Sequence, residues 1–233
     1  MLVTKILAGR PYQSYVPQPL MPVIEKREID IFRRMDQWLA STVDHVAFSE
    51  RIASAVAQPN NKLGASDQLA SSQRAADMLL IRPRVGIKHL KKVNALLLDR
   101  QDVDFRKTPV WVSAPHPAVS WHVGSPPDML NGMVKGLLAD PPTHHPASLT
   151  AIVLLFRLLQ IHPFSDGNGR TARLWSVHPI YQRIGPACGY LQLLNSLWDR
   201  ARFDIHTLSL AAQSEETLSP VFDHLEATLN DLI

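Results

Sequence analysis

Residues able to do chemistry gather in one short segment of this 233-residue chain, 162–173. A histidine there can accept a proton near neutral pH. An aspartate is a hard oxygen ligand of the kind that magnesium uses beside phosphates, and two arginines can bind phosphate oxygens in pairs. Together these groups indicate phosphoryl or nucleotidyl transfer. In chain order the segment supplies His162, Asp166, Gly167, Asn168, Gly169, Arg170 and Arg173.

The local sequence would bring these groups to one place. Pro163 ends the preceding helix, and Gly167 and Gly169 free the backbone to turn into a new helix. The first turn of a helix presents unpaired N–H groups and partial positive charge, which favour an anion. Arg170 and Arg173 are three residues apart and share a helix face. Both guanidinium groups are therefore predicted to reach the same anion.

Each of these residues also has an ordinary structural explanation when it is taken alone. A histidine at a helix end can cap or pack, an aspartate can form an Asx turn, and glycines are common in turns. Those explanations do not account for the order in which the residues occur together. The combination therefore favours the chemical interpretation.

Hydrophobic periodicity predicts a mainly helical chain. The predicted helices span 24–46, 48–56, 66–80, 86–98, 128–138, 147–161 and 169–184, with two or three more within 190–233. One β-hairpin is expected, with strands at 110–112 and 119–123, and the proline-rich stretch 7–22 is expected to be an extended arm. The helix at 147–161 is apolar nearly all round, which is typical of a helix buried inside a bundle.

Composition excludes several classes of protein. The net charge is only +3, without the dense basic stripe of a nucleic-acid scaffold, so a nucleic-acid partner is not expected. The single cysteine, Cys188, rules out an intrachain disulfide framework and a multi-cysteine metal site, and is compatible with a reducing cytosol. The most apolar stretch, 149–161, is too short to span a bilayer and contains Arg157, so no membrane partner is expected. The sequence predicts a soluble, cytoplasmic protein.

The segment His162-Pro163-Phe164-Ser165-Asp166-Gly167-Asn168-Gly169-Arg170-Thr171-Ala172-Arg173 resembles the signature of the Fic (filamentation induced by cAMP) family, H-P-F-x-[D/E]-G-N-[G/K]-R-x-x-R, at every specified position. Residues 105–112 with the hairpin that follows, and residues 126–128 with their helix, resemble the flap region of that family and the helix after it. The fold implied is all-α, a helical bundle with a small β-hairpin flap. Residues 85–210 would be the catalytic core, 1–84 an N-terminal arm and helical extension, and 211–233 a C-terminal helical segment packed on the core.

The resemblance implies a protein adenylyltransferase, which transfers AMP from ATP to a Ser, Thr or Tyr hydroxyl of a target protein and releases pyrophosphate. It implies that His162 is the base and that Asp166 holds Mg²⁺ on the α- and β-phosphates. Phe164 would anchor the loop to the core. The anion hole would consist of Gly167, Asn168 and Gly169, while Arg170 would contact the phosphates and Arg173 the γ-phosphate.

The flap would bind the target protein. Its residues Val110, Trp111 and Val112 could pair with a segment of the target as an added strand, which reads backbone rather than sequence. The alternative is an ordinary hairpin that covers the core.

One departure from the family concerns regulation. Many Fic proteins carry an inhibitory [S/T]-x-x-x-E-[G/N] helix, whose glutamate pairs with the second motif arginine, and none of the six glutamates of this chain stands in such a pattern. The segment at 49–54 resembles that helix, with Ala53 at the position of the glutamate. We therefore expect Arg173 to be free of an intramolecular glutamate, and the enzyme to be constitutively active or restrained by a separate antitoxin-like chain.

Two alternatives to AMP transfer from ATP stay open on the sequence alone. The donor could be UTP or another nucleotide, or the domain could be a non-catalytic module that binds a nucleotide or a partner. Phosphorylation is disfavoured, since the phosphorylating branch of the family has Ala and Lys where this chain has Gly167 and Gly169. The protein could act as a toxin in its own cytoplasm or as an effector delivered to another cell.

Overall fold

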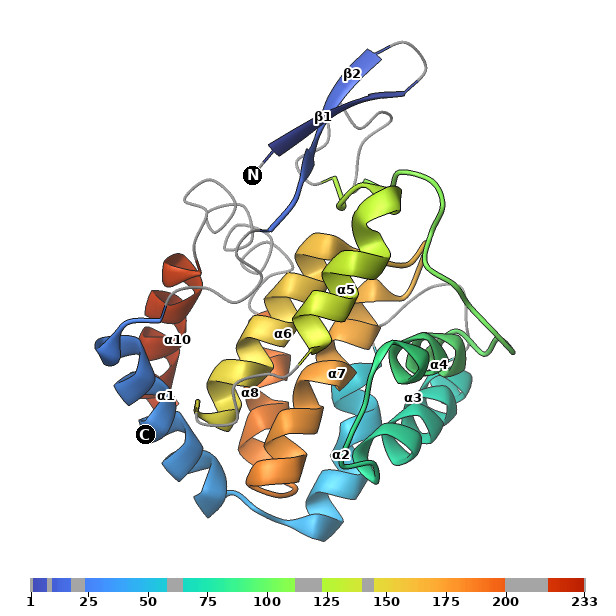
Figure 1. Ribbon diagram of the computed structural model, residues 1–233. Helices are drawn as coiled ribbons and strands as arrows, with labels where there is room; N and C mark the ends of the chain where they lie inside the picture. Colours follow the sequence, from blue (N-terminus) through green and yellow to red (C-terminus); the bar gives the residue numbers. More distant parts are fainter. Residues whose placement is uncertain are drawn as a thin grey trace.

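The computed structural model describes residues 2–7, 10–17, 24–57, 65–111, 123–139, 145–199 and 218–232. These residues form a mainly helical bundle with a two-stranded hairpin projecting from one end (Figure 1). The helical fold class is as predicted. In chain order the elements are β1 (Leu2–Leu7), β2 (Arg10–Tyr15), α1 (Lys26–Ser41), α2 (His45–Val56), α3 (Ala65–Leu80), α4 (Ile87–Leu97), the 3₁₀ turn η2 (Pro127–Met129), α5 (Leu130–Leu138), α6 (Ala147–Ile161), α7 (Asn168–Arg183), α8 (Cys188–Asp199) and α10 (Ser219–Leu232).

Helix α6 runs through the middle of the bundle, as its all-round apolar sequence predicted. Every residue of α6 except Leu159 is buried. α7 packs along it, and α1 and α5 flank it (Figure 1). Residues 162–167 connect α6 to α7, and residues 168–173 form the first turns of α7. The segment predicted to do chemistry is therefore held by two helices of the core.

The N-terminus of α6 is capped by a side chain from a distant helix. Asp36 of α1 accepts hydrogen bonds from the backbone N–H groups of Ala147 (2.7 Å) and Ser148 (2.9 Å). Ser148 Oγ in turn donates to the Phe32 carbonyl oxygen at 3.0 Å. A carboxylate at this end satisfies two of the helix's otherwise unpaired donors and complements the helix dipole. These contacts fix α6 against α1.

The predicted single helix at 24–46 is wrong, because the chain breaks after Ser41. Thr42 and Asp44 instead make backbone contacts with residues that precede and begin α8: Asp44 N donates to Pro186 O at 3.1 Å, and Cys188 N donates to Thr42 O at 3.0 Å. The Asp44 side chain then caps α2. Three- and four-residue periodicity continues through this break, so only the long-range contacts reveal it.

The predicted extended arm, 7–22, is extended at residues 10–15, while 8–9 and 18–22 lie outside the described residues. The described part also forms an antiparallel pair of strands that was not predicted. The register runs from Leu2 opposite Tyr15 to Leu7 opposite Arg10. Ser14 Oγ donates to the Gly124 carbonyl oxygen at 2.9 Å, and Lys5 pairs with Asp128 at 3.3 Å. The hairpin is thereby attached to the segment that follows the flap.

The flap is described only at its two stems. Trp111 pairs with Val123 in an antiparallel bridge, and Gly124 N donates to Val110 O at 3.0 Å. The stems therefore approach each other as a hairpin requires. Val112 and the rest of the predicted hairpin, 112–122, lie outside the described residues.

Within the described ranges, no helix combines the length and apolarity that crossing a membrane would need.

α10 packs against α1 through two contacts. The Phe32 and Phe222 rings meet edge to face with centroids 5.2 Å apart, and Arg27 forms an ion pair with Glu226 at 2.6 Å.

Candidate active site

His162 stands where α6 ends, and its backbone makes the turn out of the helix. It has φ 52° and ψ 60°, the left-handed conformation, and its N–H still donates to Leu158 O at 3.0 Å. Side chains other than glycine adopt this region uncommonly, at an energetic cost that the surroundings must offset. Pro163 follows and prevents the helix from continuing.

The His162 ring has a defined orientation. Its Nδ1 lies 3.3 Å from the Leu159 carbonyl oxygen, which can only accept a hydrogen bond. Nδ1 therefore carries the ring proton, and the basic lone pair of the neutral imidazole is on Nε2. This is the tautomer needed for Nε2 to act as a base.

Asn168 fastens the loop to itself. Its Oδ1 accepts from Phe164 N at 2.9 Å, and its Nδ2 donates to Phe164 O at 2.8 Å. The Phe164 ring is buried and packs against Phe105, with centroids 5.4 Å apart. Because both polar atoms of the Asn168 side chain serve this clamp, the contribution of Asn168 to an anion site would come from its backbone N–H.

The anion-binding candidate is the backbone of the first turn of α7. Thr171 N donates to Gly167 O at 2.9 Å, which is the first helical hydrogen bond, so the N–H groups of residues 168–170 precede the intrahelical ladder. Gly167 N is instead bonded to Asp166 Oδ1 at 2.7 Å. Three neighbouring donors at a helix N-terminus can bind an anion such as a phosphate.

Asn94 of α4 supports the loop from below, and the sequence analysis missed it. Its Nδ2 donates to Asp166 O at 3.0 Å and to Thr171 Oγ1 at 2.9 Å. Gly167, at φ +75°, lies so close that a Cβ would stand 2.8 Å from this Nδ2. Asn94 is 72 residues from Asp166 in the chain, so no local pattern could have identified it.

The two motif arginines belong to the first turns of α7, and their guanidinium groups contact the C-terminal ends of two other helices. Arg170 Nη1 donates to Leu97 O of α4 at 2.8 Å, and Arg173 Nη1 donates to Ala55 O of α2 at 3.1 Å. Both side chains are buried. Burial lowers the pKa of Arg170 from its ordinary value, and attraction to Asp166 partly offsets the effect. Their common helix face is as expected, but each guanidinium is anchored to its own carbonyl.

Asp166 is the one predicted metal ligand. Its Oδ1 is held by Gly167 N, and its side chain is half-buried at the mouth of the loop. In the part of the chain that the structure describes, no three His, Cys, Asp or Glu side chains gather into a metal site. A single carboxylate fits a magnesium ion that takes its other ligands from substrate phosphates and water, and does not fit an all-protein metal site.

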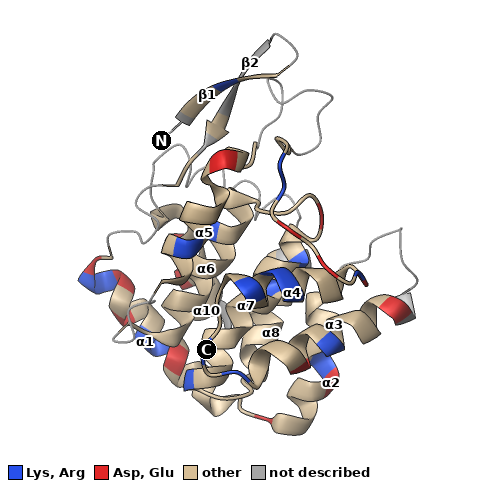
Figure 2. Cartoon of the chain, turned by 45° about the vertical axis from the view of Figure 1, so that its right-hand side comes forward, with Lys and Arg blue, Asp and Glu red and all other residues tan. Residues whose placement is uncertain are grey.

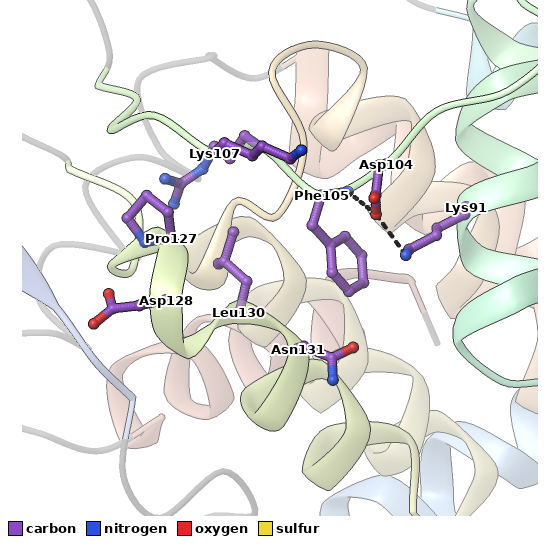
Figure 3. A pocket seen from close by; sticks show the side chains of 9 residues that line it. Lys91, Asp104, Phe105, Lys107, Pro127, Asp128, Leu130 and Asn131 are labelled. Atoms are coloured by element: carbon purple, nitrogen blue, oxygen red, sulfur yellow. Dashed lines mark hydrogen bonds and ion pairs between the residues drawn. The ribbon is translucent and has the colours of Figure 1, made fainter.

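A pocket of about 460 Å³ lies beside the loop, between α4, residues 104–107 and the start of α5 (Figure 3). Phe105 contributes its ring to the wall, and Lys91 Nζ lies 4.6 Å from the centroid of that ring. Lys91 also pairs with Asp104 at 2.5 Å, and this contact lowers the pKa of the Asp104 carboxyl. α4 itself carries Lys88, Lys91 and Lys92 and no acidic residue (Figure 2).

The fold is a mainly helical bundle, and the α6–α7 junction presents a helix N-terminus that is a candidate anion site. Residues 84–179 match the model of the Fic/DOC family. The chain thus contains a Fic/DOC domain, as its motif indicated.

Two similar proteins bear on this domain. The chain is 39% identical over 86 residues to a protein adenylyltransferase Fic of Nematostella vectensis; the match covers 35% of this chain and 18% of the relative. A crystal structure of a Fic family protein from Desulfovibrio desulfuricans G20 has a TM-score of 0.59 at 20% identity, covering 88% of this chain and 63% of that chain. At that identity the likeness concerns the fold alone. The chain spans under a fifth of the curated relative and under two thirds of the solved one.

Proposed function

We propose that this protein is an adenylyltransferase that moves AMP from ATP to a hydroxyl side chain of a target protein. The observation that carries the proposal is the juxtaposition at the α6–α7 junction. There, a histidine whose Nδ1 is the proton-bearing nitrogen precedes a helix N-terminus with three unpaired N–H groups. The name of the Nematostella vectensis relative, protein adenylyltransferase Fic, supports this choice.

The chemistry assigns one step to each group. His162 Nε2 takes the proton of the target hydroxyl while its oxygen forms a bond to the α-phosphorus. The bond from that phosphorus to the oxygen bridging to the β-phosphate breaks, and pyrophosphate leaves. The N–H groups of residues 168–170 stabilise the negative charge that grows on phosphate oxygens, because they are fixed before the reaction starts.

Asp166 would hold Mg²⁺ together with the phosphates of ATP. The ion would neutralise the charge on the phosphate oxygens and so favour departure of pyrophosphate. A half-buried carboxylate with one oxygen already bonded to Gly167 N fits a ligand that contributes a single coordination position. The basic residues of α4 add a positive field that favours a polyanionic substrate.

The flap stems would receive the target polypeptide. Val110 and Trp111 are at the first stem, next to the segment that includes Arg106. A target strand added at this edge would present its hydroxyl-bearing residue to His162. The proposed target is therefore an extended Ser, Thr or Tyr segment.

The Arg173 side chain contacts the end of α2, the helix that contains the segment 49–54, which resembles the inhibitory helix. It donates to Ala55 O, two residues beyond Ala53, and Ala53 is buried. Residue 53 is alanine, so this position of the helix has no carboxylate that could pair with Arg173. This supports our proposal that activity is unrestrained within the chain, or is restrained by a separate inhibitor.

The test uses the purified protein with Mg²⁺ and ATP labelled on either the α- or the γ-phosphate, in cell lysate. Transfer of the α label but not the γ label, abolished in His162→Asn, is the expected result. Asparagine is chosen because it tolerates the left-handed backbone of this position better than alanine does. Transfer from γ alone would mean phosphorylation. Label from UTP and not ATP would change the donor, and silence with every donor would favour a non-catalytic module.

A further inference from the structure

Arg106 lies buried directly beneath the turn at His162. Only 6% of the residue is exposed. It belongs to neither α4 nor α5 but to the segment that leads into the flap. Its Nε donates to His162 O at 2.7 Å, and its backbone N–H donates to Pro163 O at 3.0 Å. A charged side chain at such a site needs a full set of acceptors, and here backbone carbonyls provide them.

The first group of acceptors belongs to the end of α6. Besides His162 O, the carbonyl oxygen of Ile161 accepts from Arg106 Nη2 at 3.4 Å. Three successive carbonyls, 161–163, therefore receive hydrogen bonds from this one residue. The last carbonyls of a helix have no partners within it and carry partial negative charge, so a guanidinium there is both a hydrogen-bonding cap and an electrostatic complement.

The second group of acceptors belongs to the two stems of the flap. Arg106 Nη1 donates to Thr108 O of the incoming stem at 2.9 Å, and Nη2 donates to Ser125 O of the returning stem. Ser125 N closes the link by donating to Ile161 O at 3.1 Å. One planar guanidinium thus joins both flap stems to the backbone of the proposed base.

The absence of a side chain at Gly124 lets the returning flap stem lie close to both Arg106 and His162. A Cβ at this position would stand 2.7 Å from Arg106 Nη2 and 2.9 Å from His162 Cβ. Its backbone is therefore in contact with both residues at once. A methyl group at residue 124 would therefore push the flap stem away from His162.

We propose that Arg106 is a positioning residue that couples the flap to His162, so that the flap holding the target also sets the orientation of the base. The inference rests on the proposed function for its catalytic part. The left-handed backbone of His162 must be stabilised by contacts with its surroundings. Arg106 provides such contacts through its hydrogen bond to His162 O, and the same guanidinium also binds both stems of the flap. Lysine could not replace it, because a point-like ammonium lacks the planar fork that reaches four carbonyls in fixed directions.

Two variants disturb this junction from opposite sides, Arg106→Lys and Gly124→Ala. The control is Asp36→Ala, which weakens α6 at its other end and touches neither loop nor flap. Each variant is compared at a temperature where its folded fraction matches that of the wild type. If Arg106→Lys does not fold, Gly124→Ala tests the same contact without removing the buried charge.

The first readout is amide hydrogen exchange, which needs no activity. Both junction variants should accelerate exchange at the amides of residues 124 and 125 by about tenfold, whereas Asp36→Ala should leave these amides as in the wild type. Unchanged exchange at both amides in the junction variants would overturn the coupling.

The second readout is the kinetics of AMP transfer. The kcat should fall about a hundredfold in the junction variants, as expected for a misplaced base, with KM for ATP unchanged and the control near wild type. A loss no greater than that of the control would reduce Arg106 to a structural residue. If the wild type transfers no label, the proposed function fails, while the exchange experiment still decides the coupling.

Discussion

Replacing Gly167 with alanine should destabilise the loop between α6 and α7, and the geometry gives the size of the effect. The left-handed backbone at φ +75° costs alanine about 1–2 kcal/mol relative to glycine. The new Cβ would stand 2.8 Å from Asn94 Nδ2 and displace it. Asn94 would then lose its bonds to Asp166 O and Thr171 Oγ1, at about 1 kcal/mol each. We expect the free energy of unfolding to fall by about 3–4 kcal/mol.

Urea denaturation followed by circular dichroism measures this loss, and Gly132→Ala is the matched control. Gly132 lies within α5, and a Cβ there would meet no atom within 4 Å. The same substitution at Gly132 should therefore raise stability by about 0.5–1 kcal/mol, because alanine favours the helix. An ordinary surface substitution changes the free energy of unfolding by no more than about 0.5 kcal/mol. If Gly167→Ala changes it by no more than this, the reasoning on the loop is refuted.

Three further predictions concern the rest of the molecule. Asp36→Ala removes both bonds to the N-terminus of α6 and should cost about 1–3 kcal/mol in urea denaturation; an unchanged midpoint would contradict this cap. Ala53→Glu should depress AMP transfer by bringing a carboxylate toward Arg173, and the neutral Ala53→Gln should not; equal turnover in both variants and the wild type would reject an inhibitory position. Burial lowers the pKa of His178 below its ordinary 6.5, so the unfolded chain binds more protons and stability should decline as pH falls below about 6.5. His178→Gln should weaken that decline, and an identical pH profile would contradict the assignment.

The helices could be predicted wherever packing follows local pattern. α6 occupies 147–161 in both sequence and structure, since an apolar run between Pro146 and Pro163 leaves few alternatives. The break after Ser41 could not be predicted, because it depends on contacts of Thr42 and Asp44 with residues more than 140 positions away. The strand pairing of the N-terminal arm likewise depends on partners near Gly124 and Asp128.

The proposed site shows the same division. The motif placed its groups on one loop and identified Asp166 and His162 as candidates, and the structure brings them to the α6–α7 junction. Asn94 and Arg106 were missed, since each acts on backbone atoms more than fifty residues distant. The carbonyls that hold Arg170 and Arg173 are also long-range partners, supplied by Leu97 and Ala55.

The proposed role of His162 as the base of AMP transfer is tested most directly by measuring pyrophosphate release and label incorporation in one reaction with α-labelled ATP. The wild type should form one pyrophosphate for each AMP attached to protein. His162→Asn should lose both signals while retaining its melting temperature, since asparagine tolerates the turn. Incorporation that persists in folded His162→Asn, or pyrophosphate released without labelled protein, would contradict the assignment.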